Sequence, residues 1–267
     1  MKPDLQLLQF TDPHLYGDAS QTLRGIATLP ALTRTLAHAR ADIHGARAIL
    51  VTGDIVQDDP AGYPHFRGAF GGLGKPVYCI PGNHDDVEAM SAALAEAPFQ
   101  ICGHADFERW RVVMLDSSVP GMAQGRLSLL TLQRLEAALA SADGRYVLVC
   151  LHHHPVTMDS RWLDTVALTN ADEFFAVIDR YECVRALLWG HVHQAFEGER
   201  KGVRLMGTPS TCAQFRPHAA NFAIDSQPPA YRRLNLHADG SVESEVVWVS
   251  EAGAQSRTAT SQNSLRA

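Results

Sequence analysis

Five short clusters of aspartate, asparagine and histidine give this sequence groups that could bind metal ions. Carboxylate oxygens, amide oxygens and imidazole nitrogens together suit cations such as Fe, Mn, Zn and Co. The clusters are residues 12–14 (DPH), 52–54 (TGD), 82–85 (GNHD), 152–154 (HHH) and 190–193 (GHVH).

Each cluster taken alone has a second interpretation. Asp12 and His14 are potential ligands of one cation or ordinary surface polarity. Asp54 could bridge two cations with its two oxygens, or cap a helix. In the third cluster Gly82 permits a sharp turn, Asn83 offers an amide oxygen, and Asp85 could orient the imidazole of His84, or the whole run is only a turn. His191 and His193 point the same way in extended chain and could be ligands or a buried pair.

The elements that must position these clusters are strands. An apolar run precedes every cluster, as expected of a buried strand, at 5–10, 48–51, 77–80, 146–150 and 184–189. Helical patterns lie between these runs, at 29–43, 86–97, 127–142 and 171–181. The alternation predicts an α/β fold in which the clusters meet at the carboxyl ends of the strands. From about residue 194 we expect a second, more antiparallel sheet, with a hairpin turn at HADG (237–240).

Independent chance does not readily place five such clusters at one edge of a sheet. Together they therefore predict a metal site. Two aspartates, one asparagine and four histidines suffice for two metals that share one carboxylate. Structural zinc is disfavoured because such sites favour cysteine, and the cysteines stand apart from the motifs.

Composition narrows the classes of partner. The net charge is −6 and no lysine/arginine cluster occurs, which argues against a nucleic-acid polymer as partner. A small anionic substrate stays open because bound cations could supply positive charge. No apolar stretch approaches the roughly 20 residues of a membrane span, and five cysteines without a CxxC pair predict a reduced, cytoplasmic protein. We expect one domain over 1–250 and a disordered tail over 251–267.

The order D-x-H, GD, GNHD, H-x-P, GHxH resembles that of the calcineurin-like metallophosphoesterases. Within them, the sequence looks like the class III cyclic nucleotide phosphodiesterases of bacteria, through GDIVQD (53–58), SRWLD (160–164), GHVHQ (190–194), PSTCAQFRPH (209–218) and LHADG (236–240). The resemblance covers roughly residues 5–250. It implies a four-layer α/β/β/α sandwich of two mixed β-sheets flanked by helices. It also implies two metal ions, with Fe and Mn favoured and Zn or Co open.

The resemblance also assigns roles, residue by residue. One metal takes Asp12, His14, Asp54 and His193, and the second takes Asp54, Asn83, His153 and His191. A hydroxide bridging the metals attacks phosphorus in line. His84, with Asp85 beside it, helps the leaving oxygen depart.

The implied substrate is 3′,5′-cyclic AMP, which opens to 5′-AMP, so the activity would lower cellular cyclic AMP. A glycerophosphodiester or a 2′,3′-cyclic nucleotide is the alternative. A DNA nuclease is disfavoured by the acidic charge, and a catalytically dead scaffold by the complete set of motif residues. Substrate contacts fall on Asn83, His84, His193 and Arg216, although Arg216 fits a surface position equally well. Trp162 could stack on a base or belong to the core. Relatives of this class often form homodimers.

Among the three consecutive histidines the pattern selects one. In an extended strand His153 points opposite to His152 and His154. The family's H-x-P motif also places its ligand two residues before proline, which implies His153.

Overall fold

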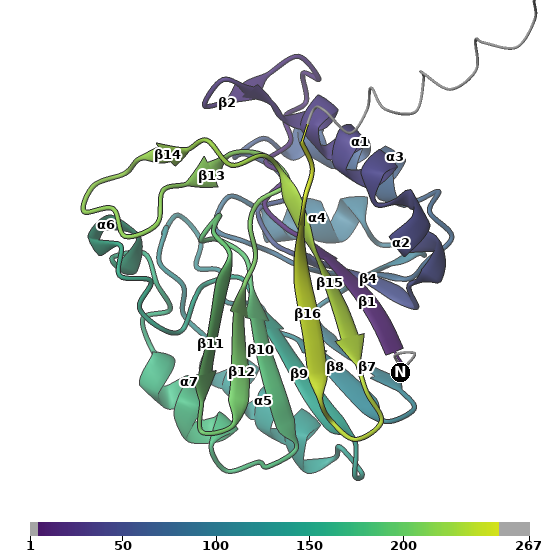
Figure 1. Ribbon diagram of the computed structural model, residues 1–267, viewed down its shortest axis with the longest axis vertical. Helices are drawn as coiled ribbons and strands as arrows, with labels where there is room; N and C mark the ends of the chain where they lie inside the picture. Colours follow the sequence, from purple (N-terminus) through teal and green to yellow (C-terminus); the bar gives the residue numbers. More distant parts are fainter. Residues whose placement is uncertain (1–4, 251–267) are drawn as a thin grey trace, which may run out of the picture.

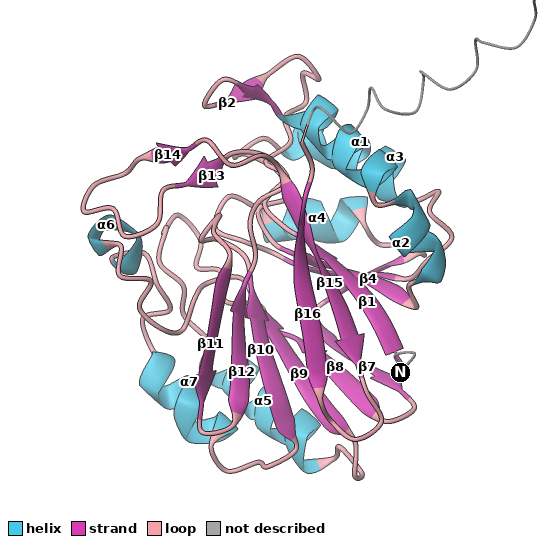
Figure 2. Cartoon of the chain, viewed as in Figure 1, coloured by secondary structure: helices cyan, strands magenta, loops and turns pink. Residues whose placement is uncertain are grey.

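Two six-stranded mixed sheets face each other, and helices cover their outer faces (Figures 1 and 2). The computed structural model describes residues 5–250. The tail predicted to be disordered, 251–267, lies outside the described residues. Among the described residues no helix combines the length and the apolar character needed to cross a membrane.

The first sheet carries the first three ligand clusters. Its strands lie in the order β16-β15-β1-β4-β5-β6. Strands β1, β4, β5 and β6 are parallel, whereas β15 pairs antiparallel with β1 and with β16. The bounds are β1 Leu5–Phe10, β4 Ala48–Thr52, β5 Val77–Ile80, β6 Phe99–Ile101, β15 Ala230–Leu236 and β16 Val242–Trp248.

The second sheet carries the two histidine clusters. Its strands lie in the order β11-β12-β10-β9-β8-β7, with a parallel centre and an antiparallel strand at each edge. The bounds are β7 Gly103–Phe107, β8 Trp110–Met114, β9 Tyr146–Leu151, β10 Val184–Trp189, β11 Phe196–Arg200 and β12 Val203–Gly207.

Helices pack on the outer face of each sheet. Apolar side chains of α1 to α4 pack against β1, β4 and β5, and those of α5 to α7 pack against β8, β9 and β10. The bounds are α1 Thr28–His38, α2 Arg40–Gly45, α3 Tyr63–Phe70, α4 Val87–Ala93, α5 Leu129–Ala140, α6 Arg161–Asp164 and α7 Ala171–Ile178, with a 3-10 turn at Pro60–Gly62. Two short hairpins complete the chain: β2 Thr22–Leu23 with β3 Ile26–Ala27, and β13 Gln214–Phe215 with β14 Ile224–Asp225.

A third apolar layer lies between the two sheets. Inward-facing residues of both sheets, among them Leu7, Leu50, Leu148 and Leu188, are completely buried there. Burial on both faces explains why the central strands read as continuous apolar runs. The layers confirm the predicted α/β/β/α sandwich of two mixed sheets.

The prediction for the chain beyond residue 194 was wrong in one respect. Its strands do not form a sheet of their own: β11 and β12 extend the second sheet, and β15 and β16 return to the first. The antiparallel pairing is confirmed for β11 with β12 and for β15 with β16. The expected turn at HADG joins β15 to β16, with Gly240 at φ 86°.

Candidate metal centre

All five clusters follow the carboxyl ends of central strands, and the resulting loops converge between the two sheets. The backbone turns sharply at several of them: φ is 53° at Asp12, 49° at Asp54 and 66° at His191. Left-handed conformations of non-glycine residues cost free energy and concentrate at functional sites. Gly190 lets the loops approach closely, because a Cβ atom there would collide with Thr11 and Asp12.

One group of ligand atoms is formed by Asp12, His14 and His193. The Nε2 atoms of His14 and His193 are 3.1 Å apart, and that of His193 lies 3.3 Å from a carboxylate oxygen of Asp12. Asp54 joins this group, since its carboxylate lies 3.7 Å from Nε2 of His14. Asp12, His14, Asp54 and His193 are all buried. The structure thus brings together all four residues predicted for the first metal.

A second group lies on the other side of Asp54, and it contains His152. Nε2 of His152 lies 3.4 Å from the Asp54 carboxylate, 3.2 Å from Oδ1 of Asn83 and 3.2 Å from Nδ1 of His191. Asp54 is therefore shared by both groups, as a bridging ligand must be.

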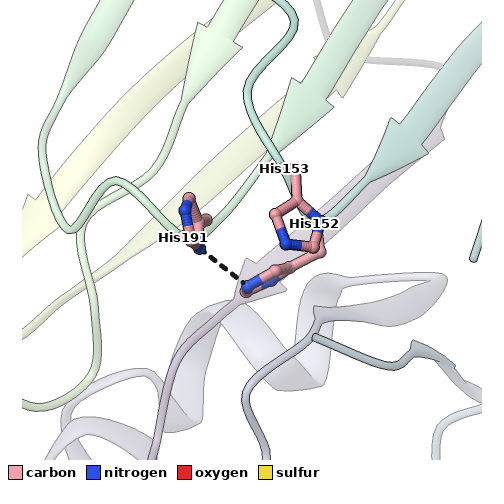
Figure 3. Close-up of side chains that lie close together, drawn as sticks. All are labelled: His152, His153 and His191. Carbon is pink, nitrogen blue, oxygen red and sulfur yellow. Dashed lines mark hydrogen bonds between the residues drawn. The ribbon is translucent and has the colours of Figure 1, made fainter. Parts of the chain in front are cut away.

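The prediction of His153 rested on the family's H-x-P motif and on the alternation of side chains in an extended strand, and the structure contradicts only the alternation. Strand β9 ends at Leu151, so all three histidines lie in the following loop and their side chains do not alternate. Nδ1 of His153 lies 2.8 Å from the hydroxyl of Ser117, while its ring sits 4.7 Å from that of His191 (Figure 3). His154 is also buried, with its ring stacked on His191. His152 is thus the histidine in contact with Asp54 and Asn83, while Nε2 of His153 is buried without a hydrogen-bond partner and belongs with His152 and His191 to one group of potential ligands.

Backbone carbonyls fix the orientation of two of these imidazoles. Nδ1 of His193 donates to the carbonyl of Ala213 at 2.6 Å, and Nδ1 of His152 donates to that of Thr52 at 2.7 Å. Each bond places a proton on Nδ1 and leaves Nε2 facing the centre.

Electrostatics favour a cation here. Burial raises the pKa of a carboxyl group, but neighbouring histidines hold the pKa of Asp12 below its usual value and that of Asp54 well below it. Burial lowers the pKa of His14 to about 3 and that of His191 well below its usual range, which keeps both imidazoles neutral. Burial also disfavours charge on His152, yet Asp54 raises its pKa to about 9, so a proton sits where a cation would bind.

The residues fit a dinuclear metal centre. Within the described residues, Asp12 and Asp54 form ion pairs with histidine alone, and Nδ1 of His14 and Nε2 of His191 are buried without a hydrogen-bond partner. Groups of three potential ligands have their donor atoms within 4.8 Å of one another. The donors are oxygen and imidazole nitrogen without thiolate, a set that suits Fe, Mn, Zn or Co.

His84 stands at the edge of this centre, and its partner differs from the one expected. Its Nδ1 lies 3.0 Å from Oδ2 of Asp58 and 2.9 Å from Nε2 of Gln57, and its side chain is 31% exposed. Burial lowers the pKa of His84, but Asp54 and Asp58 outweigh it and the pKa is raised. The imidazole is therefore held by Asp58, whose only signal in the sequence is its place in GDIVQD.

Asp85 does not orient His84. Its carboxylate accepts hydrogen bonds from the backbone N–H groups of Gly82, Ile55 and Val56 and from the hydroxyl of Tyr63. It ties the GNHD loop to the loop that follows β4, so the structure gives it a supporting position behind the candidate ligands.

A cavity of about 270 Å³ opens from the metal centre. Its wall includes His14, Asp54, Asn83, His84, His191 and His193 together with Arg24, Trp162, Phe215 and Phe222. Arg216, predicted to contact substrate, is exposed and does not line this cavity, because the short β13–β14 ribbon turns it outward. Arg24 is the arginine that lines the cavity instead, and no sequence motif pointed to it.

Comparisons with known proteins agree with this geometry. Residues 5–195 match the model of the calcineurin-like phosphoesterase family. The chain is 39% identical to the 3′,5′-cyclic adenosine monophosphate phosphodiesterase CpdA of Haemophilus influenzae, over 94% of this chain and 92% of that protein. It is 38% identical to CpdA of Escherichia coli K12, over 96% and 94% of the two chains.

Two solved structures with low sequence identity to this chain share its fold. A dimetal phosphatase from Danio rerio superposes with a TM-score of 0.67 at 14% identity, covering 93% of this chain and all of that one. A purple acid phosphatase from yellow lupin superposes with a TM-score of 0.59 at 12% identity, covering 93% of this chain and 54% of that one. The family model and the high coverage by relatives above 30% identity lead to one conclusion: this chain belongs to the calcineurin-like phosphoesterase family.

Proposed function

We propose that this chain is a phosphodiesterase that hydrolyses 3′,5′-cyclic AMP to 5′-AMP and so lowers cellular cyclic AMP. The observation that carries the chemistry is the pair of buried ligand groups that share Asp54. The substrate rests on the cyclic nucleotide phosphodiesterases that resemble this chain over nearly its whole length. A glycerophosphodiester or 2′,3′-cyclic nucleotide substrate is the alternative.

We assign one cation to Asp12, His14, Asp54 and His193, and the other to Asp54, Asn83, His152 and His191. Cations bound there would neutralise the phosphodiester anion and would lower the pKa of water to supply a nucleophile near pH 7. The protein's own part is to hold these donors in fixed orientations, through Ala213 and Thr52, and to exclude bulk water by burial.

His84 is the group that meets the leaving oxygen in this proposal. In the protonated imidazole Nδ1 donates to the carboxylate of Asp58, which leaves Nε2 free toward the cavity. When the bond between phosphorus and O3′ breaks, Nε2 gives its proton to O3′, and the hydroxyl of the attacking water stays on phosphorus. The raised pKa of His84 favours the protonated form that this step needs.

A turnover assay with defined metals tests this proposal. We expect the full-length chain loaded with Mn or Fe to convert cyclic AMP to 5′-AMP, and to lose this activity with a chelator and regain it with metal. Cyclic GMP, glycerophosphodiesters, 2′,3′-cyclic AMP and bis(p-nitrophenyl) phosphate serve as comparisons. Turnover of the generic diester without turnover of cyclic AMP would reject the proposed substrate and favour the alternative.

For the metals themselves we propose Fe and Mn, from the mixed nitrogen and oxygen donors and the behaviour of the family. We expect protein purified without added metal to contain close to two equivalents of metal in total, dominated by these elements. Elemental analysis measures this directly. Less than one equivalent under all loading conditions would contradict a dinuclear site, and a dominant zinc signal would correct the identity.

The cytoplasm is the compartment that we propose, because all five cysteines are free thiols in the structure. Homodimerisation stays a prediction.

A further inference from the structure

Beside the metal centre lies a cluster of three aromatic rings, Trp162, Phe215 and Phe222. Each ring meets the other two edge to face: the centroids are 5.2 Å apart for Trp162 and Phe215, 5.1 Å for Trp162 and Phe222, and 5.3 Å for Phe215 and Phe222. All three line the cavity that opens from the centre. The cluster is thus a flat-sided apolar wall within the candidate site.

This wall begins directly at a proposed metal ligand. The ring of Phe215 stacks on the imidazole of His193, with centroids 4.0 Å apart and planes 6° from parallel. A phosphate bound at the centre would therefore have the aromatic wall as its neighbour. In a nucleoside cyclic phosphate the group closest to the phosphate after the ribose is the base, which is flat and aromatic.

Three separate excursions of the chain build the wall, as seen in the upper part of Figure 1. Trp162 comes from α6, and Phe215 and Phe222 come from the β13–β14 ribbon and its loop. Arg24 comes from the β2–β3 hairpin, and its guanidinium lies 4.7 Å above the ring of Phe222. Arg24 and Gly25 have φ of 52° and 84°, the conformation of a two-residue type I′ turn, which projects Arg24 from the hairpin tip.

The exposure of these rings distinguishes them from the core. Phe222 is 41% exposed, and Trp162 and Phe215 are partly buried, whereas the large aromatics between the layers, such as Trp110 and Trp189, are buried almost completely. Accessible aromatic faces at a nucleotide site bind bases by stacking and by edge contacts. The cavity volume, about 270 Å³, lies near the lower limit of roughly 300 Å³ for small-molecule sites, which suits a small ligand.

We propose that Trp162 and Phe222 form the base-binding subsite of this enzyme, with Phe215 joining it to the metal centre and Arg24 closing it over Phe222. The proposal rests on the proposed function and names the residues that make a nucleotide a better substrate than a simple phosphodiester. The subsite recognises a planar, aromatic base attached to the cyclic phosphate.

The test compares two substrates that share the scissile bond. One is cyclic AMP, and the other is the 3′,5′-cyclic phosphate of 1-deoxyribose, which has the same ring and no base. The variants are Trp162→Ala and Phe222→Ala in the metal-loaded full-length chain. We expect each to lower the ratio of kcat/KM for cyclic AMP to that for the abasic compound by about tenfold or more, mainly through a higher KM for cyclic AMP.

Two controls separate base binding from a structural effect. Trp162→Phe keeps an aromatic face and should restore most of the ratio. Trp248→Ala removes an aromatic that is 36% exposed on the edge strand β16, similar to Phe222, and should leave the ratio unchanged. Variants that lower kcat/KM equally for both substrates would show that the cluster only supports the fold.

The activity of the wild-type chain on the two substrates distinguishes failure of the base-binding subsite from failure of the proposed function. Hydrolysis of cyclic AMP with equal efficiency to the abasic compound would overturn the subsite and leave the proposed chemistry intact. Hydrolysis of the abasic compound without hydrolysis of cyclic AMP would overturn the proposed function and the subsite together.

Discussion

Replacing His152 by alanine is expected to lower kcat/KM more than 100-fold and to release one of the two metals. His152 is the only one of the three consecutive histidines whose Nε2 contacts Asp54, Asn83 and His191. Its loss leaves the second cation with fewer ligands and removes one of the two histidines beside the Asp54 carboxylate. The expected loss exceeds the 10- to 100-fold that is typical when a residue only orients a ligand. Metal content by elemental analysis and steady-state kinetics measure both effects.

The matched control is His153→Ala, next along the chain and equally buried. His153 contacts Ser117 and the ring of His191, so its loss should cost about 10- to 100-fold in activity while most of the metal stays bound. Thermal unfolding of both variants shows whether the fold survives. If His153→Ala empties the site and His152→Ala does not, the assignment from the H-x-P motif is correct. The assignment of His152 from its contacts with Asp54 and Asn83 is then wrong.

The choice among the three histidines shows what sequence patterns can and cannot define. The strand ending at Leu151 was predictable because a strand buried on both faces must be apolar throughout. The same pattern correctly located β1, β4, β5 and β10 and therefore the edge at which the ligands meet. Which of three adjacent histidines turns inward depends on loop dihedrals beyond the strand, and no periodicity constrains those.

Long-range partners were beyond prediction for a related reason. Asp58 meets His84 across 26 residues, and the sequence suggested the adjacent Asp85 instead. The carboxylate of Asp85 instead accepts hydrogen bonds from three backbone N–H groups. These bonds depend on how two loops pack together, which the sequence does not show. Arg24 likewise reaches the cavity through a two-residue turn that has no ligand motif. Motifs identified the candidate metal ligands, whereas the residues that support the site or line the cavity beside it were found only in the tertiary structure.

Replacing His84 by alanine is expected to lower kcat for cyclic AMP by about 100-fold or more, the usual scale for loss of a general acid, with the metal content unchanged. None of the ligand contacts between Asp54, His152 and Asn83 involves the His84 side chain. The backbone N–H of His84, which donates to Asp54 at 2.9 Å, is retained in the alanine variant. Kinetics and elemental analysis on the same preparation test both parts.

The leaving group provides the decisive control, because a proton donor matters only when the departing oxygen needs a proton. A ribose alkoxide needs one, whereas p-nitrophenolate delocalises its charge into the nitro group and leaves without one. His84→Ala should therefore slow bis(p-nitrophenyl) phosphate much less than cyclic AMP. Asp58→Asn removes one of the two charges that raise the pKa of His84, the other being Asp54, and should show a weaker form of the same pattern. Equal losses on both substrates would mean that His84 positions the phosphate and does not protonate the leaving oxygen.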